Sequence, residues 1–282
     1  MTERIELSDT PHLKTLLARA VVSGRRRGDR LPDVEVVAPE VRIMPADLAA
    51  YSRVCGIGVG ARIPVTYPHV LAFPLALTLM TRSDFPLPLL GSVHVENHTS
   101  WTRPVLPHEP LAITVRAADL RSHRRGRAVD IVTDVRASGE QVWQERSAYL
   151  APGAGADPAA SWPPPPDASA LTVSPSRIQV PGDIGRRYAA ISGDLNPIHL
   201  SALSARPFGF RAAIAHGMWA YTRLLGVLSP RVPTVGESSV WFRSPIPLGA
   251  SVRVAVDEQG ELAALLPLAS PAPHLLVGLT RR

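Results

Sequence analysis

Residues 188–199 read Tyr-Ala-Ala-Ile-Ser-Gly-Asp-Leu-Asn-Pro-Ile-His, and a His216-Gly217 pair begins seventeen residues after that last histidine. The stretch puts a carboxylate, Asp194, and an imidazole, His199, on either side of an Asn-Pro pair that cannot continue a helix. Gly217 then opens an apolar stretch that we expect to be helical. An acid/base pair close to a helix N-terminus suits the addition of water to a polarised double bond.

Outward from this stretch, residues 152–175 divide the chain. They contain a Pro-Gly-Ala-Gly-Ala-Asp-Pro run, then Trp162 and four consecutive prolines. This composition predicts an extended linker that lies over the surface. We therefore expect an N-terminal unit at residues 1–151 and a C-terminal unit at residues 176–282, which carries the motif.

The two halves echo one another. A Pro-x-Asp sequence leads to a glycine in each half, from Pro45 to Gly56 in the first and from Pro181 to Gly193 in the second. Each pattern predicts a short helix that ends at the glycine. A longer apolar stretch follows in each half and predicts one further helix per half.

Strand-like runs with short turns complete each half. The longer helices are expected at about residues 70–80 and 217–228, and the strands at 34–43, 92–101, 111–120, 128–138, 141–150, 176–180, 238–243, 251–257, 262–268 and 275–279. Consecutive strands with short turns form an antiparallel sheet, and the lone apolar helix must pack against that sheet. The sequence thus predicts an α+β arrangement that occurs twice.

Composition limits the classes of partner. The 282 residues carry a formal net charge of +6, which favours anionic partners, and 45% are hydrophobic, enough for a buried core. Only 5% are aromatic, and no basic helix interleaves them, which argues against nucleic acid. No window approaches the roughly eighteen uncharged apolar residues of a membrane span, and the single Cys55 excludes an intrachain disulfide. We expect a soluble, cytoplasmic protein.

The motif from Tyr188 to His199, with His216-Gly217 downstream, resembles the MaoC-like, (R)-specific enoyl-thioester hydratases and dehydratases (hydratase 2), which have the hotdog fold. The dense match covers residues 180–226. The first half is similar only in layout, as in double-hotdog members whose N-terminal repeat has lost the motif. The resemblance implies an α+β double hotdog in which each repeat wraps a sheet around one long helix and only the C-terminal repeat is catalytic.

The resemblance also implies the roles of individual residues. Asp194 and His199 are the catalytic pair, and which of them is the base and which the acid stays open. Gly217 is the oxyanion donor. The supporting positions are Ser192, Gly193, Asn196 and His216. In the first half, we expect Phe73-Pro74 in place of the His-Gly pair, so that the oxyanion donor is lost because proline has no N–H.

The expected reaction is the reversible hydration of trans-2-enoyl thioesters to (R)-3-hydroxyacyl thioesters in fatty-acyl metabolism. Coenzyme A or acyl carrier protein enters as part of the substrate, and no metal or other cofactor, nucleic acid or membrane is expected. A homodimer is left open. Two alternatives remain: a hotdog acyl-thioesterase, which does not require the Asp-x-Asn-Pro-x-His pairing, and a non-catalytic acyl-thioester-binding subunit.

Three further patterns receive structural interpretations. The glycines of residues 56–60 do not form a dinucleotide-binding fingerprint and lie where the first repeat has lost its catalytic loop. The His-Val-Glu-Asn-His run at residues 94–98 predicts a polar strand face rather than a metal site. The arginine-rich residues 121–127 predict a solvated hairpin, with phosphate binding as the alternative.

Overall fold

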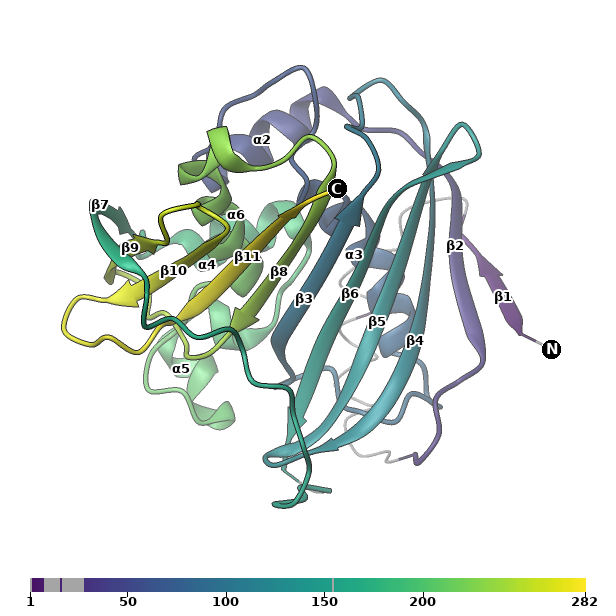
Figure 1. Ribbon diagram of the computed structural model, residues 1–282. Coiled ribbons are helices and arrows are strands. Elements are labelled where there is room, and N and C mark those ends of the chain that lie inside the picture. Colours follow the sequence, from purple (N-terminus) through teal and green to yellow (C-terminus); the bar gives the residue numbers. More distant parts are fainter. Residues whose placement is uncertain (1, 8–15, 17–27, 154) are drawn as a thin grey trace.

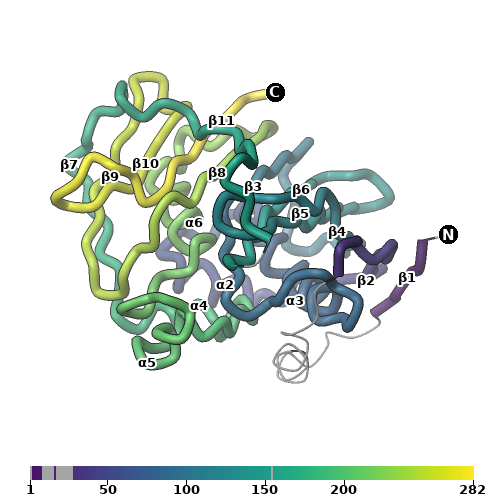
Figure 2. The backbone as a smooth tube through the Cα atoms, turned by 90° about the horizontal axis from the view of Figure 1, so that it is seen from below, coloured from purple at the N-terminus to yellow at the C-terminus, as the bar shows by residue number. Residues whose placement is uncertain are grey.

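The structure is a computed structural model that describes residues 2–7, 16, 28–153 and 155–282. In the described residues, eleven strands form one continuous sheet in the order β1-β2-β4-β5-β6-β3-β8-β11-β10-β9-β7. The helices lie on one side of this sheet, as the two perpendicular views show (Figure 1, Figure 2). The sheet therefore has one face that packs against helices in each half.

The N-terminal half contributes six strands. They are β1 (Glu3–Glu6), β2 (Val34–Val41), β3 (Val93–Trp101), β4 (Leu111–His123), β5 (Gly126–Ala137) and β6 (Glu140–Pro152). Its helices are α2 (Pro45–Cys55) and α3 (Tyr67–Met80). β1 pairs with β2 in parallel, whereas the other strands of this half pair antiparallel.

The C-terminal half repeats this plan with five strands. They are β7 (Thr172–Gln179), β8 (Gly236–Phe242), β9 (Ser251–Val256), β10 (Leu262–Pro267) and β11 (Leu275–Arg281). Its helices are α4 (Ile184–Ser192), α5 (Ala202–Ala205) and α6 (Gly217–Val227), with 3-10 turns η1 (Pro197–His199), η2 (Arg206–Phe208) and η3 (Ser229–Arg231). All ten expected strands are present, β1 is an addition, and the predicted α+β class is confirmed.

The helix ends agree with the sequence patterns except at the start of α3. Gly56 and Gly193 follow α2 and α4 in the left-handed conformation that ends helices. α3 begins at Tyr67, three residues before the expected position, because Pro68 occupies the first turn, where its missing N–H has no helical partner in any case. This helix packs against β2, β4, β5 and α4.

The two halves share one sheet and one core. β3 pairs antiparallel with β8, with Asn97 opposite Val240, and this pairing makes the sheet continuous. Buried hydrogen bonds also cross between the halves, since the Tyr51 hydroxyl lies 2.9 Å from both Thr66 Oγ1 and Thr222 Oγ1. The helices of one half are therefore held against those of the other.

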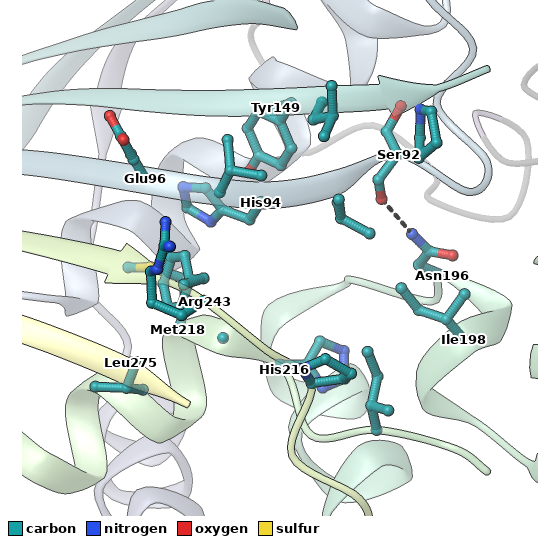
Figure 3. A pocket seen from close by; sticks show the side chains of 18 of the residues that line it. Ser92, His94, Glu96, Tyr149, Asn196, Ile198, His216, Met218, Arg243 and Leu275 are labelled. Atoms are coloured by element: carbon teal, nitrogen blue, oxygen red, sulfur yellow. Dashed lines mark hydrogen bonds between the residues drawn. The ribbon is translucent and has the colours of Figure 1, made fainter. Parts of the chain in front are cut away.

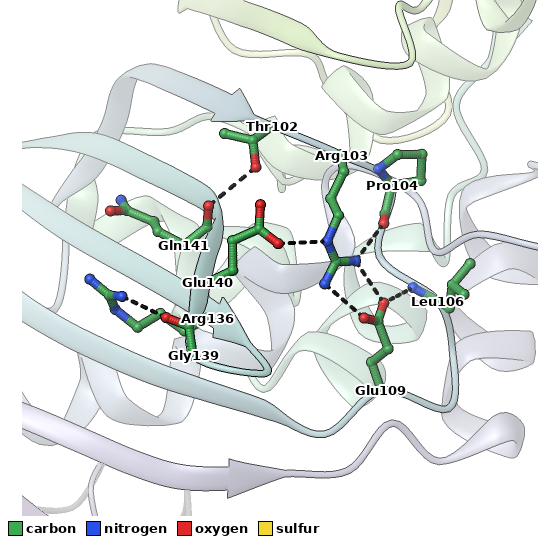
Figure 4. Close-up of polar contacts among 9 residues, drawn as sticks. All are labelled: Thr102, Arg103, Pro104, Leu106, Glu109, Arg136, Gly139, Glu140 and Gln141. Atoms are coloured by element: carbon green, nitrogen blue, oxygen red, sulfur yellow. Dashed lines mark hydrogen bonds and ion pairs between the residues drawn. The ribbon is translucent and has the colours of Figure 1, made fainter.

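A polar cluster holds the loop that follows β3 (Figure 4). Arg103 donates to both carboxylate oxygens of Glu109, at 2.8 and 3.1 Å, and to Glu140 at 3.2 Å. The Leu106 N–H donates to Glu109 at 2.7 Å. This loop is the N-terminal counterpart of residues 244–247, which follow β8.

The segment between β6 and β7 crosses the outside of the molecule and is anchored by Trp162. The indole N–H donates to Glu96 at 2.5 Å, and the Arg121 guanidinium lies 4.5 Å from the ring centroid. The His123 ring contacts the indole edge-on, with ring centroids 5.0 Å apart.

No helix in the described ranges is long and apolar enough to cross a bilayer.

Candidate active site

A cavity of about 810 Å³ lies between the two repeats. One wall comes from the N-terminal sheet, where His94 and Tyr149 point into the open space (Figure 3). The facing wall comes from the C-terminal repeat and carries Ile198 and His216 (Figure 3). Asp194, His199 and Gly217 also line this cavity, so the expected catalytic residues face the same space.

Asp194 lies just beyond the C-terminus of α4, where the backbone leaves the helix. Its N–H donates to Ser192 Oγ at 3.2 Å, and that hydroxyl in turn donates to the Tyr188 carbonyl at 2.8 Å. The Asn196 N–H donates to Asp194 Oδ1 at 3.1 Å, a local turn typical of Asp side chains. These bonds leave Oδ2 directed towards the two imidazoles, and 29% of the side chain is accessible from the cavity.

His199 ends the short turn η1 and faces Asp194. Its Nδ1–H donates to the Ile214 carbonyl at 2.9 Å, which assigns the proton of the neutral ring to Nδ1. The other nitrogen, Nε2, lies 3.9 Å from Asp194 Oδ2. Both atoms are therefore acceptors, at a separation that one bridging water can span.

His216 supports this pair from behind. Its Nε2–H donates to the backbone carbonyl of Asp194 at 3.0 Å, and its ring stacks on His199 with centroids 3.7 Å apart. Burial and the adjacent His199 lower the pKa of His216 to about 3. His216 is therefore a neutral residue that positions the loop.

The protonation states follow from burial and neighbours. Burial by itself would raise the pKa of Asp194, but the two imidazoles and the Asn196 N–H outweigh it, and the pKa lies below its usual range. Burial lowers the pKa of His199, and Asp194 offsets this only in part. Near neutral pH the site thus holds a carboxylate beside a neutral imidazole.

Gly217 is the first residue of α6, so its N–H has no partner within the helix. A Cβ at this position would lie 2.8–3.1 Å from the ring of Phe242, so any other residue would require that ring to shift. Glycine therefore allows the start of α6 to approach β8, at the floor of the cavity. The N–H and the positive end of the helix dipole are available to an oxyanion.

Asn196 ties the catalytic loop to the other repeat. Its side-chain amide donates to the Ser92 carbonyl at 3.2 Å, across the cavity edge (Figure 3). Gly185 fixes the loop from its own repeat, since a Cβ there would lie 1.8 Å from the His199 carbonyl oxygen. Helix α4 and the turn η1 are thus in direct backbone contact.

The same cluster is the one group in the described part of the chain with metal-ligand geometry. Ligand atoms of Asp194, His199 and His216 lie within 4.8 Å of one another. The His216 Nε2, however, carries the proton that it donates to the Asp194 carbonyl, so that atom offers no lone pair. The donor set suits a bound water better than a cation.

The prediction that Phe73-Pro74 is the N-terminal counterpart of His216-Gly217 is wrong. Both residues lie in the middle of α3, because that helix begins at Tyr67. Apolar periodicity predicts the body of a helix but not its first turn, where Pro68 stands. Phe73 is instead an apolar wall residue of the main cavity.

Backbone pairing identifies the true counterpart. The Ala215 N–H, just before the His-Gly pair, donates to the Ile246 carbonyl at 2.8 Å. The equivalent bond in the N-terminal repeat joins the Ile63 N–H to the Val105 carbonyl at 3.0 Å, so a Pro-Val pair stands in place of His-Gly. The cavity at this point measures about 20 Å³ and is lined by Pro64, Val65, Trp101, Pro104 and Trp143. Bulky side chains fill the site of the N-terminal repeat.

The polar wall of the N-terminal repeat was not predicted from the sequence. Glu145 occupies an inward position of β6 and contacts His69 of α3, and both are buried. A glutamate at the inward position of an alternating strand, and a histidine within an otherwise apolar helix, are signals that the sequence already carried.

Residues 94–98 form a polar strand face only in part. A bulge in β3 puts His94 against His69 and Tyr149. Glu96 accepts a hydrogen bond from Trp162, and its Oε2 lies 3.6 Å from His98 Nε2 on the same face. His98 pairs with Ser239 of β8 at 2.8 Å. In the 121–127 hairpin, Arg124 and Arg125 are exposed at the cavity mouth, which fits the phosphate-binding alternative.

The comparisons with known proteins agree with this geometry. Residues 165–264 match the MaoC like domain. The chain is 37% identical over 258 residues to 3-hydroxyacyl-thioester dehydratase X of Mycobacterium tuberculosis, which covers 88% of this chain and 90% of that protein. The chain belongs to the MaoC-like dehydratase family.

Solved structures of relatives extend this MaoC-like assignment to the fold. The crystal structure of HtdX from Mycobacterium tuberculosis matches with a TM-score of 0.76 and 34% identity, and covers 87% of this chain and 98% of that one. A second M. tuberculosis protein, described as having a double hotdog fold, matches with a TM-score of 0.56 and 13% identity over 86% of this chain and 92% of that one. This MaoC-like chain is a double hotdog.

Proposed function

We propose that this MaoC-like dehydratase catalyses the reversible addition of water to trans-2-enoyl thioesters, giving (R)-3-hydroxyacyl thioesters. The observation that carries the proposal is the pair of acceptors, Asp194 Oδ2 and His199 Nε2, at 3.9 Å in the cavity that Gly217 also lines. The printed name of the full-length M. tuberculosis relative, a 3-hydroxyacyl-thioester dehydratase, supports the reaction class.

In this mechanism the water lies between the two acceptors. It donates one hydrogen bond to Asp194 Oδ2 and the other to His199 Nε2, so that its lone pair is free for C3 of the enoyl group. As oxygen bonds to C3, one proton of the water passes to an acceptor of the pair. A proton is then delivered to C2, which completes the addition of one water molecule; dehydration is the reverse.

Charge that develops on the thioester oxygen needs a donor. The Gly217 N–H at the start of α6 is placed beside the same cavity, and an N–H at a helix N-terminus stabilises an oxyanion without reorganisation. Loss of one such donor typically slows a reaction about 100-fold or more. We assign Gly217 this role.

The carrier group is expected at the mouth of the cavity. Arg124 and Arg125 follow β4 and Arg243 follows β8, and all three exposed residues border the opening. Guanidinium groups there can bind the phosphates of coenzyme A or the acidic surface of a carrier protein. The sequence leaves open which of these carriers is used and whether the protein forms a homodimer. The cytoplasmic location stays a prediction.

A substrate assay separates the proposal from its alternatives. Incubation with crotonyl-CoA should lower the enoyl absorbance without releasing free thiol, as hydration requires. Release of free thiol would indicate a thioesterase. Binding without either change, over a panel of acyl lengths on both carriers, would indicate a non-catalytic subunit. Chiral analysis of the product tests the (R) configuration.

Two substitutions test the catalytic pair. Asp194→Asn and His199→Ala should each lower kcat at least about 100-fold, because each removes an acceptor for the reacting water. Asp183→Asn and His108→Ala, which alter exposed side chains, are the matched controls and should leave kcat near the wild-type value. Near-wild-type rates in both site variants would contradict the mechanism.

A further inference from the structure

A buried chain of polar side chains ends in the wall that the N-terminal repeat contributes to the cavity. His69 lies on α3, and its Nδ1 contacts Glu145 Oε2 at 2.8 Å. The other oxygen of Glu145 accepts a hydrogen bond from Asn97 Nδ2 at 2.5 Å. Asn97 also donates to Ser147 at 3.0 Å and accepts from Thr99 at 2.8 Å. Both carboxylate oxygens of Glu145 are thus hydrogen-bonded, and His69 is the member of the chain that lines the cavity.

This network is costly to bury. The exposed fraction is 9% for His69, and Asn97 is completely buried, yet the interior of a protein disfavours an ion pair relative to apolar side chains of the same volume. One and two turns further along α3, Phe73 and Leu77 are apolar and line the same cavity. A buried charge pair beside these apolar wall residues is best explained if a polar group of a ligand binds to it in the cavity.

Glu145 determines which edge of the His69 ring is available. Nδ1 is occupied by the carboxylate, so Nε2 is the nitrogen that can reach a ligand in the cavity. Burial disfavours the imidazolium, but the charge and hydrogen bond of Glu145 outweigh it and raise the pKa of His69. Nε2 therefore presents a charge-assisted N–H donor.

The position of Glu145 along β6 places the His69–Glu145 pair away from the mouth. Pro152, at the end of β6, borders the opening beside Arg125. Glu145 is seven residues earlier on the same strand, which is roughly 23 Å at the rise of an extended strand. The catalytic loop lies nearer the mouth than Glu145 does, because Asn196 bonds to Ser92, next to Val93, which pairs with Leu150, five residues after Glu145 on β6. A substrate whose phosphates lie at the mouth therefore passes the catalytic loop before its acyl chain reaches His69.

We propose that His69 binds an oxygen atom carried by the acyl chain beyond C3, such as a hydroxyl or keto group, so that the enzyme selects oxygenated acyl thioesters over plain alkyl ones. The inference rests on the proposed function, because that function puts an acyl chain in this cavity. Hydrogen bonds to charged groups change equilibria by about tenfold or more. A preference of about tenfold in kcat/KM is therefore expected.

The test compares enoyl-CoA substrates of equal chain length with and without one mid-chain hydroxyl or keto oxygen, at several positions. The key variant is the double substitution His69→Leu/Glu145→Gln, which removes the imidazole without leaving a buried charge and retains a hydrogen-bond partner for Asn97. Leu71→Val, on the same helix at a position that does not line the cavity, is the control. The wild-type ratio of kcat/KM for the oxygenated substrate to that for the plain one, about ten, should fall to about one in the double variant and should persist in Leu71→Val.

Each other outcome overturns the proposal. If the wild-type enzyme hydrates alkyl substrates well and the kcat/KM ratio of oxygenated to plain substrates is near one, the enzyme lacks the proposed selectivity. An equal fall in kcat/KM on both substrates means that His69 contacts a part common to all substrates, such as the pantetheine amides. A lower melting temperature with an unchanged ratio means that the pair is structural. Absence of hydration with every thioester would overturn the proposed function itself, and this inference with it.

Discussion

Asp194 and His199 differ in chemistry but present the same kind of atom to the cavity. The Ile214 carbonyl accepts the Nδ1 proton of His199, so Nε2 carries a lone pair, and Asp194 is ionised. Two acceptors at 3.9 Å bind one water by its two protons and direct its oxygen outward. At the scale of single residues, reactivity therefore depends on a backbone carbonyl that lies outside the motif.

The pH dependence of the reaction follows from these states. Because burial lowers the pKa of His199 below 6.5, the neutral ring persists as the pH falls through that value. The pKa of Asp194 is also lowered, so kcat/KM should stay level around neutrality and decline only below pH 6.5, by about tenfold per pH unit. A pH–rate profile checks this, with circular dichroism to show that the fold persists. A midpoint at or above 6.5 would contradict the assigned states.

At the scale of elements, the catalytic loop is held by close backbone contacts on its own side and by one side chain across the cavity. α4 touches the turn η1 at Gly185, where no Cβ fits against the His199 carbonyl. Asn196 bonds to Ser92 of the other repeat. The loop is thus located by packed elements on both sides, which is the requirement for a water-binding pair.

Gly185→Ala should disturb the site without altering any group that reacts. The added Cβ pushes η1 away from α4, and displacements of about 1 Å typically cost up to 100-fold in rate, so kcat should fall at least about tenfold. Gly182→Ala, at a position with open space around it, is the control and should retain activity. Steady-state kinetics on folded protein measures both. Equal activities would show that η1 adjusts without loss.

At the scale of the whole molecule, the two repeats contribute different parts to the proposed site. In the proposed mechanism the C-terminal repeat supplies the reacting groups, while its N-terminal counterpart is filled around Trp101 and Trp143 and leaves only about 20 Å³. The N-terminal sheet instead forms a wall of the 810 Å³ cavity, together with the linker residues 160–165. One catalytic site per chain is the expected stoichiometry, and active-site titration with a tight inhibitor can measure it.

The basic mouth makes a prediction about the carrier. Arg124→Ala/Arg125→Ala should raise KM for a CoA thioester about fivefold or more, and the effect should shrink as salt screens the charges. The same variant should act normally on an N-acetylcysteamine thioester, which has no phosphates. Arg186→Ala/Arg187→Ala, on the exposed face of α4, is the charge-matched control. An equal KM change on both substrates would contradict phosphate binding at the mouth.

Local patterns predicted much of this protein. Glycine and proline punctuation located α2 and α4, alternation located the strands, and the spacing of Asp194, His199 and Gly217 predicted one site, since such signals depend on neighbours in the chain. The start of α3 was predicted three residues too late, because Pro68, which is tolerated in the first turn of a helix, was not recognised as part of it.

Only the tertiary structure decided what lies around the motif. The pairing of β3 with β8, the hydrogen bond from Asn196 to Ser92 and the contact of His69 with Glu145 join residues 76 to 145 positions apart. No local periodicity encodes such contacts, since they arise when two repeats bury their faces against each other. The sequence by itself predicted which groups form the site; the folding of two repeats into one sheet decided which cavity they face and what else lines it.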